Sequence, residues 1–157
     1  MVGSVARNRR TADGARAPGT KQGVSAPPED VAGVRIEVLV TFRDARGNLF
    51  EPLDDRGLSA QKNVHVVLTQ PGKVRGNHSH QRSTETTTVV GLCLVRLKGP
   101  GGVRDVPVPA DEVWRFTIPP GIAHAYRGAG NQRMTMVSFS TQLHEAGNSD
   151  TLREVIL

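Results

Sequence analysis

The chain has 157 residues, enough for one domain with a buried core and too few for two ordinary domains. Its formal net charge is +5, and residues 1–27 carry most of it because five Arg and Lys residues there accompany a single Asp. The remaining sequence is nearly neutral and poor in aromatic residues, which argues against nucleic acid as a partner. No apolar run resembles a signal peptide or approaches the ~20 residues of a membrane span, so we expect a soluble cytoplasmic protein with no membrane partner.

The first thirty residues differ in composition from the rest of the chain. They are rich in Gly, Ala, Pro, Ser and Arg and show no apolar periodicity. Such a segment cannot bury enough apolar surface to offset the entropy lost on ordering, so residues 1–30 are predicted to be a disordered basic tail. The folded domain is then expected to span residues 31–157.

From residue 34 onward, short β-branched segments alternate with turns rich in Gly and Pro, and no stretch keeps an i, i+3, i+4 apolar pattern over the length of a helix. Many short strands at this spacing predict an all-β domain, either a sandwich or a jelly-roll barrel whose interior can hold a ligand. The predicted strands, in chain order, are 34–42, 48–52, 62–69, 84–90, 92–98, 104–108, 112–118, 124–127 and 133–141.

Three side chains in these strands are predicted to be structural. Cys93 is the only cysteine, which excludes an internal disulfide and a cysteine-cluster zinc site. Its place in an apolar run predicts a small core residue rather than a reactive thiol. Trp114 and Phe116 share one face of their strand, so we expect them in the core or in a contact between subunits.

Four residues form a candidate metal site. His78 and His80 stand two residues apart, and on a strand such residues point to the same face, so both imidazoles can converge on one point. Glu85 follows five residues later, and His124 follows a tight Pro-Pro-Gly turn. Three imidazole nitrogens and one carboxylate suit a divalent metal ion, for which zinc is the first expectation and iron, nickel and manganese are alternatives.

Two spaced motifs in these segments carry a family resemblance. Residues 72–85 match the pattern G-x5-H-x-H-x4-E, and residues 119–124 match P-x-G-x2-H. With both blocks in this order, the chain resembles the cupin superfamily. The resemblance implies a jelly-roll barrel of two antiparallel sheets, a metal held by the four residues named above, and pairing into a homodimer through sheet surfaces.

Within that superfamily, residues 48–157 resemble the C-terminal metal cupin domain of capsular-polysaccharide enzymes that epimerise UDP-4-keto sugars. A more distant resemblance is to the dTDP-4-dehydrorhamnose 3,5-epimerase group, which shares an Arg-Gly-x-His segment and relies on a His base with a Tyr acid. Both imply an isomerase or epimerase that acts on a nucleotide-linked keto sugar in polysaccharide or natural-product biosynthesis. The segments that carry the first resemblance are 54–57, 70–80, 118–124 and 148–151.

Epimerisation next to a keto group requires removal of a C–H proton and stabilisation of the enediolate that forms, for which a metal can act as Lewis acid. Tyr126 shares the strand face of His124 and is a candidate to give or take the proton, or else a barrel-lining aromatic with a satisfied hydroxyl. His65, which alternates with valines, is a second candidate base or a structural histidine. Arg75 and Arg127 adjoin the ligand segments and are candidate contacts to a diphosphate of the substrate.

Two other functions are compatible with the same ligand set. Iron in place of zinc supports dioxygenase chemistry in the superfamily, and a metal barrel can also be a non-catalytic module that binds a metal or a small molecule. The fold does not choose among these functions because one barrel hosts many chemistries.

Overall fold

The computed structural model describes residues 33–145 and 147–157, so the tail predicted over residues 1–30 lies outside the described residues. Strands dominate the described part of the chain. Its elements are β1 (Arg35–Val38), β2 (Phe42–Asp44), β3 (Gly47–Leu49), α1 (Asp55–Ser59), β4 (Asn63–Thr69), β5 (Val74–His80), β6 (Glu85–Val90), β7 (Cys93–Gly99), β8 (Gly102–Val108), β9 (Val113–Ile118), β10 (Ala123–Gly128), β11 (Met134–Ser140) and β12 (Thr151–Arg153).

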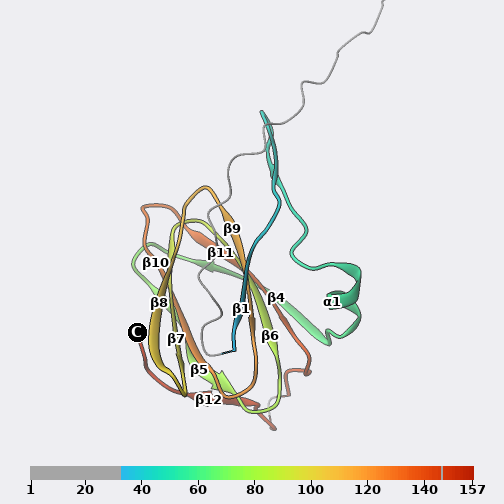
Figure 1. Cartoon of the computed structure of the whole chain (residues 1–157), viewed down its shortest axis with the longest axis vertical. Helices are drawn as coiled ribbons and strands as arrows, with labels where there is room; N and C mark the ends of the chain where they lie inside the picture. Colours follow the sequence, from blue (N-terminus) through green and yellow to red (C-terminus); the bar gives the residue numbers. More distant parts are fainter. Residues whose placement is uncertain (1–32, 146) are drawn as a thin grey trace, which may run out of the picture.

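Two five-stranded antiparallel sheets form the barrel shown in Figure 1. One sheet has the strand order β1-β9-β6-β11-β4, and the other has the order β12-β5-β10-β7-β8. The hairpin of β2 and β3 forms a separate sheet and extends away from the barrel. The predicted all-β jelly-roll barrel of the cupin type is therefore confirmed. Within the described residues, no helix has the length and apolar character needed to cross a membrane.

The inward faces of the two sheets build one core. Directly opposite residues on antiparallel strands share a face, so Thr87 with Phe116 and Val89 with Trp114 line the same side of their sheet. Trp114 is 4% and Phe116 0% exposed, which confirms both as core residues. Cys93 is buried as well, and burial raises the pKa of its thiol to about 12.

Two predicted strands near the start of the domain are shorter than expected. The segment predicted as one strand over 34–42 is interrupted, because β1 ends at Val38 and Phe42 already begins the projecting hairpin. The strand predicted over 48–52 ends with β3 at Leu49. Phe42 and Leu49 are directly opposite in the hairpin, and both are exposed to solvent, so this hairpin does not contribute to the core.

Three further elements are absent from the sequence prediction. The short helix α1 lies between two predicted strands, and the side chain of Asp54 caps it by accepting a hydrogen bond from the Gly57 backbone N–H at 2.7 Å. The strand β5 is not recognised in the sequence because Gly76 and Asn77 both have positive φ, which interrupts the regular alternation of side chains along a strand. The strand β12 is only three residues long and exposed, so it has no apolar pattern.

The edge strand β4 has an apolar outer face. Val64, Val66 and Leu68 alternate along it and are 56%, 63% and 54% exposed. β4 is the last strand in its sheet, so one row of its backbone groups is not paired within that sheet. An apolar strip on an edge strand is a surface that a protein usually covers.

Candidate metal centre

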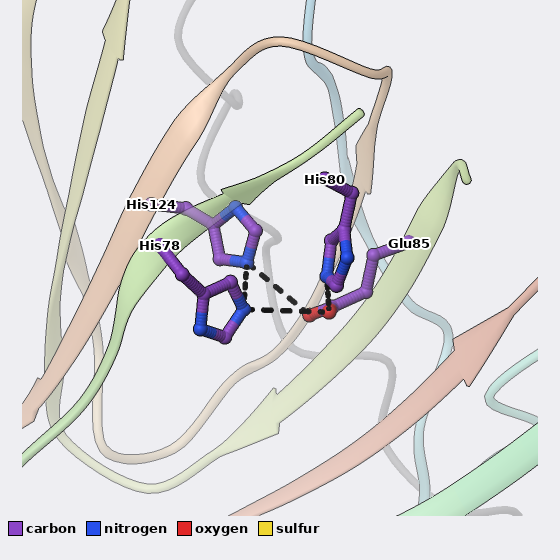
Figure 2. A group of neighbouring side chains, drawn as sticks. All are labelled: His78, His80, Glu85 and His124. Atoms are coloured by element: carbon purple, nitrogen blue, oxygen red, sulfur yellow. Dashed lines mark hydrogen bonds and ion pairs between the residues drawn. The ribbon is translucent and has the colours of Figure 1, made fainter. Parts of the chain in front are cut away.

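The four predicted ligands converge between the two sheets. His78 and His80 lie on β5 and His124 on β10 of one sheet, whereas Glu85 begins β6 of the other. Figure 2 shows their side chains pointing toward one another. One nitrogen or oxygen atom of each residue lies within 4.8 Å of the corresponding atoms of the others. The structure thus brings together the two motifs, although Glu85 and His124 are 39 residues apart in the sequence.

The distances between the ligand atoms fit a bound metal ion. His124 Nε2 lies 3.1 Å from His78 Nε2 and 3.6 Å from Glu85 Oε1. The Nε2 atoms of His78 and His80 lie 4.0 and 2.9 Å from Glu85 Oε2. Four ligands placed about 2.1 Å from a zinc ion in tetrahedral geometry are about 3.4 Å from one another, and the observed distances bracket that value. The group therefore could hold a divalent ion.

The tautomer of His124 suits a metal ligand. Its side chain is fully buried, and Nδ1 lies 3.1 Å from the backbone oxygen of Ile122. A carbonyl oxygen only accepts, so Nδ1 carries the proton and donates it. The lone pair of Nε2 then points toward the other ligands, which is the arrangement found where a backbone carbonyl orients a metal-bound imidazole.

A β-bulge in β5 aims His78 at the site. In the pairing of β10 with β5, His124 lies opposite His78 and Ala125 opposite Gly76, so Asn77 is the extra residue. Gly76 has a φ of 81° and Asn77 a φ of 58°. A Cβ atom at Gly76 would lie only 2.7 Å from the backbone oxygen of His124. Glycine is therefore required here both for its positive φ and because there is no space for a side chain.

The last residues of the chain hold this bulge in place. Asn77 Oδ1 accepts hydrogen bonds from the backbone N–H groups of Ile156 and Leu157 at 2.8 and 3.0 Å. Asn77 Nδ2 donates to the backbone oxygen of Leu157 at 3.1 Å. Asparagine is one of the few residues that tolerate a positive φ, and these three bonds fix its side chain. The closing segment therefore supports the turn that orients His78.

Glu85 is ionised and fixed by a chain of hydroxyl groups. Burial alone would raise the pKa of its carboxyl, but the three imidazoles beside it, led by His124, hold the pKa well below its ordinary value. Thr87 Oγ1 donates to Glu85 Oε1 at 2.6 Å and lies 2.7 Å from Ser138 Oγ. Because Thr87 has a single hydroxyl proton, Ser138 donates to Thr87. The carboxylate is thereby held in one orientation.

His80 lies between two carboxylates. Its Nε2 is 2.9 Å from Glu85 Oε2, and its Nδ1 is 3.6 Å from Asp150 Oδ2. Burial lowers the pKa of His80. The hydrogen bond with Glu85 and the negative charges of Glu85 and Asp150 raise this pKa by more than burial lowers it, so the net shift is upward. A metal ion at Nε2 requires the imidazole to give up the proton on that nitrogen.

Tyr126 lies in the barrel interior beside His124. It is 2% exposed, and its ring centroid is 5.9 Å from that of His124 and 6.5 Å from that of Phe116. Burial, followed by the charge of Glu85, raises the pKa of Tyr126 well above its ordinary value, and the nearby Thr87 hydroxyl offsets this only in part, so the phenol is protonated at neutral pH. Among the described residues, its hydroxyl has no partner with hydrogen-bond geometry. The predicted catalytic role of Tyr126 stays a prediction.

The other three predicted site residues are exposed. His65 on β4 lies opposite Ser138 and so shares the inward face of its sheet. Arg75 lies opposite Tyr126 and also shares the inward face. Arg127 directly follows Tyr126 on β10, so it points to the outer face, away from the ligands. His65 and Arg75 stay candidate site residues, whereas the orientation of Arg127 does not favour its predicted contact with substrate.

Sequence reasoning missed the residues that orient the ligands. Thr87 could have been found, since it lies two residues after Glu85 on the same strand and so shares its face. Asp150 stands in a closing segment that carries the family resemblance, but nothing in the sequence indicates that it lies beside His80. Asn77 looks like an ordinary loop residue until its φ is known.

The fold and the ligand set together define a cupin barrel with a candidate metal centre. A model of the polysaccharide biosynthesis C-terminal domain matches residues 42–152, and the chain belongs to that family. The matched range includes all four candidate ligands. A search of curated proteins finds no match.

Solved structures with a similar fold include proteins that handle sugars and polysaccharides. A capsular polysaccharide assembling protein, CapF from Staphylococcus aureus, is 23% identical with a TM-score of 0.57, and the match covers 75% of this chain and 34% of CapF. A dTDP sugar isomerase from Desulfovibrio desulfuricans G20 is 20% identical with a TM-score of 0.67, covering 80% of this chain and 85% of that one. The 3'-monoepimerase ChmJ from Streptomyces bikiniensis, in complex with dTDP-quinovose, is 17% identical with a TM-score of 0.61, covering 73% and 67%. The chain thus spans about a third of the length of CapF.

Proposed function

We propose that the chain is a metal-dependent cupin that isomerises or epimerises a nucleotide-linked keto sugar in polysaccharide or natural-product biosynthesis. The observation that carries the proposal is the convergence of three imidazoles and one carboxylate inside the barrel of a polysaccharide-biosynthesis family member. The substrate class is supported by the similar folds of a dTDP sugar isomerase and of a 3'-monoepimerase in complex with dTDP-quinovose.

The ion would be held by the four converging side chains, and zinc is the proposed ion because it takes nitrogen and carboxylate ligands at these spacings. When bound, it supplies Lewis acidity toward a keto oxygen. Elemental analysis of protein purified without added metal tests its identity. Zinc agrees with the proposal, whereas iron together with oxygen uptake favours the alternative dioxygenase function.

The protein residues would bind the sugar nucleotide and move one proton. The C–H proton next to the keto group leaves from one face of the sugar and a proton returns to the other face, so no atom is gained or lost. Tyr126, which shares the interior face of His124, is proposed as the proton donor, and His65, exposed on the inward face of β4, as the base. Arg75 is exposed on the inward face of β5, and its guanidinium is proposed to pair with the diphosphate.

Deuterium exchange tests the proposed reaction. A UDP- or dTDP-4-keto sugar is incubated with the protein in D₂O, and incorporation next to the keto carbon is followed by NMR. We expect incorporation with the wild type and with His144→Ala, which removes an exposed histidine, and none with His124→Ala. No exchange in any keto sugar with the wild type would contradict an isomerase and favour a non-catalytic binding module.

We also propose that the chain forms a homodimer. The proposal is supported by the apolar strip on β4, where three exposed aliphatic side chains, Val64, Val66 and Leu68, share the outer face of an edge strand. In a dimer with two-fold symmetry, the strips of the two chains would pack against each other, so that both are covered.

A further inference from the structure

Asp150 lies on the far side of His80 from Glu85. The two ring nitrogens of His80 face different carboxylates, because Nε2 is 2.9 Å from Glu85 Oε2 and Nδ1 is 3.6 Å from Asp150 Oδ2. His80 Nδ1 is buried and forms no hydrogen bond with any described residue. The side chain of Asp150 is itself only 11% exposed. A half-buried carboxylate therefore faces a buried nitrogen that has no other acceptor in the described structure.

The chain returns to this point by strand pairing. β12 pairs with β5, and Thr151 lies opposite His80. Asp150 directly precedes Thr151, and its backbone oxygen accepts a hydrogen bond from the Gln81 N–H at 2.9 Å. The backbone of Asp150 is therefore placed beside His80 by the register of two strands.

The carboxylate is also held by the segment that joins β5 to β6. Asp150 Oδ2 accepts hydrogen bonds from the backbone N–H and the hydroxyl of Ser83, at 2.9 and 2.5 Å. Asp150 Oδ1 accepts from the backbone N–H and the Nε–H of Arg82, at 2.9 and 3.2 Å. These four donors fix the orientation of the carboxylate and keep it charged. They also suggest a competing explanation, in which Asp150 only anchors this segment.

We propose that Asp150 is the positioning residue of the metal ligand His80. Its negative charge beside Nδ1 favours the tautomer in which Nδ1 carries the proton, which leaves the lone pair of Nε2 for the ion. Outer carboxylates of this kind orient metal-bound histidines, and their loss typically lowers metal affinity about 10- to 100-fold. The inference rests on the proposed metal centre and adds to it a residue outside the four ligands.

Metal affinity of matched variants tests this role. Asp150→Asn keeps the size of the side chain, removes the charge beside His80 and replaces one of the two acceptor oxygens that Ser83 and Arg82 contact. Ser83→Ala removes one anchoring hydrogen bond of Asp150 and leaves that charge in place. Asp105→Asn removes an exposed carboxylate that pairs with Arg96, so it controls for loss of charge alone. Zinc affinity is measured by competition with a chelator, and the visible spectrum of bound cobalt reports the ligand geometry.

We expect zinc affinity to fall about 10- to 100-fold in Asp150→Asn, with a changed cobalt spectrum, and to stay near the wild-type value in both other variants. Wild-type affinity in Asp150→Asn would overturn the inference while leaving the metal centre intact. An equal loss in Ser83→Ala would also overturn it, because anchoring of the segment would then explain the effect. Absence of zinc binding by the wild type would overturn the metal centre itself and this inference with it.

Discussion

The ligand side chains differ in the neighbouring groups that hold them in place. His124 donates from Nδ1 to a backbone oxygen, and Glu85 accepts from Thr87. His80 faces the carboxylate of Asp150. These contacts decide which lone pair of each side chain faces a metal ion. Tyr126 is different, because its buried hydroxyl has no hydrogen-bond partner among the described residues.

Replacing Tyr126 by Phe removes this hydroxyl and keeps the ring. An unsatisfied buried polar group costs about 1–3 kcal/mol, so we expect the free energy of unfolding, measured in urea, to be unchanged or higher in Tyr126→Phe. If the hydroxyl is the proton donor, deuterium exchange in a keto sugar falls while zinc affinity stays the same. A loss of stability of about 1 kcal/mol or more would contradict the structure, because it would mean that the hydroxyl has a partner.

The buried thiol of Cys93 gives a second prediction for a single residue. Burial raises its pKa from 9.0 to about 12, so the thiol is neutral in the folded protein at any moderate pH. We expect no alkylation by iodoacetamide at pH 8 in buffer and rapid alkylation in denaturant. The unfolded chain ionises first as pH rises above 9, so this group lowers the free energy of unfolding between pH 9 and about 12. Rapid alkylation of the folded protein at pH 8 would contradict this burial.

Among the elements, β5 explains why local sequence patterns are insufficient. Its bulge at Gly76 and Asn77 interrupts the alternation that identifies a strand, so the sequence does not predict β5. The His-x-His spacing still places His78 and His80 on one face, because both follow the bulge and the strand is regular there. The ligands were therefore predictable, while the bulge that aims them was not.

Glycine is required at position 76 for its positive φ and for lack of space for a Cβ atom, and a comparison with Gly72 distinguishes these two effects. Gly72 and Gly76 have φ of 71° and 81°, but an added Cβ has no neighbour within 4 Å at Gly72, whereas at Gly76 it meets a backbone oxygen at 2.7 Å. We expect Gly72→Ala to cost about 1 kcal/mol of stability from φ alone. Gly76→Ala should cost clearly more and should weaken zinc binding, because β10 must move away from β5. Equal stability and equal zinc affinity in the two variants would contradict the proposed role of the bulge.

Across the whole molecule, the sequence predicts features carried by local motifs and misses contacts that depend on pairing between distant strands. The motifs over 72–85 and 119–124 predict a ligand set that the barrel does bring together. Asp150 lies beside His80 because β12 pairs with β5, and no local sequence pattern predicts an exposed strand of three residues. The face of Arg127 could have been predicted, since it lies an odd number of residues after His124 on one strand.

The apolar strip on β4 leads to a prediction about assembly. We expect the wild type to sediment as a dimer at micromolar concentration and Val66→Glu to sediment as a monomer, because a charge would have to be buried in the contact. Val103→Glu is the matched control, since Val103 is 54% exposed on β8, an edge strand of the other sheet. A monomeric wild type, or a dimer that survives Val66→Glu, would contradict a dimer through β4.

We propose that one metal ion is bound jointly by four side chains, those of His78, His80, Glu85 and His124. The most direct measurement is zinc titration of the metal-free protein, followed by isothermal calorimetry, for the wild type, His124→Ala and His144→Ala. We predict one zinc ion per chain for the wild type and for His144→Ala, and a loss of this site in His124→Ala without unfolding. No zinc binding by the folded wild type, or equal binding by His124→Ala, would contradict a metal site built from these four residues.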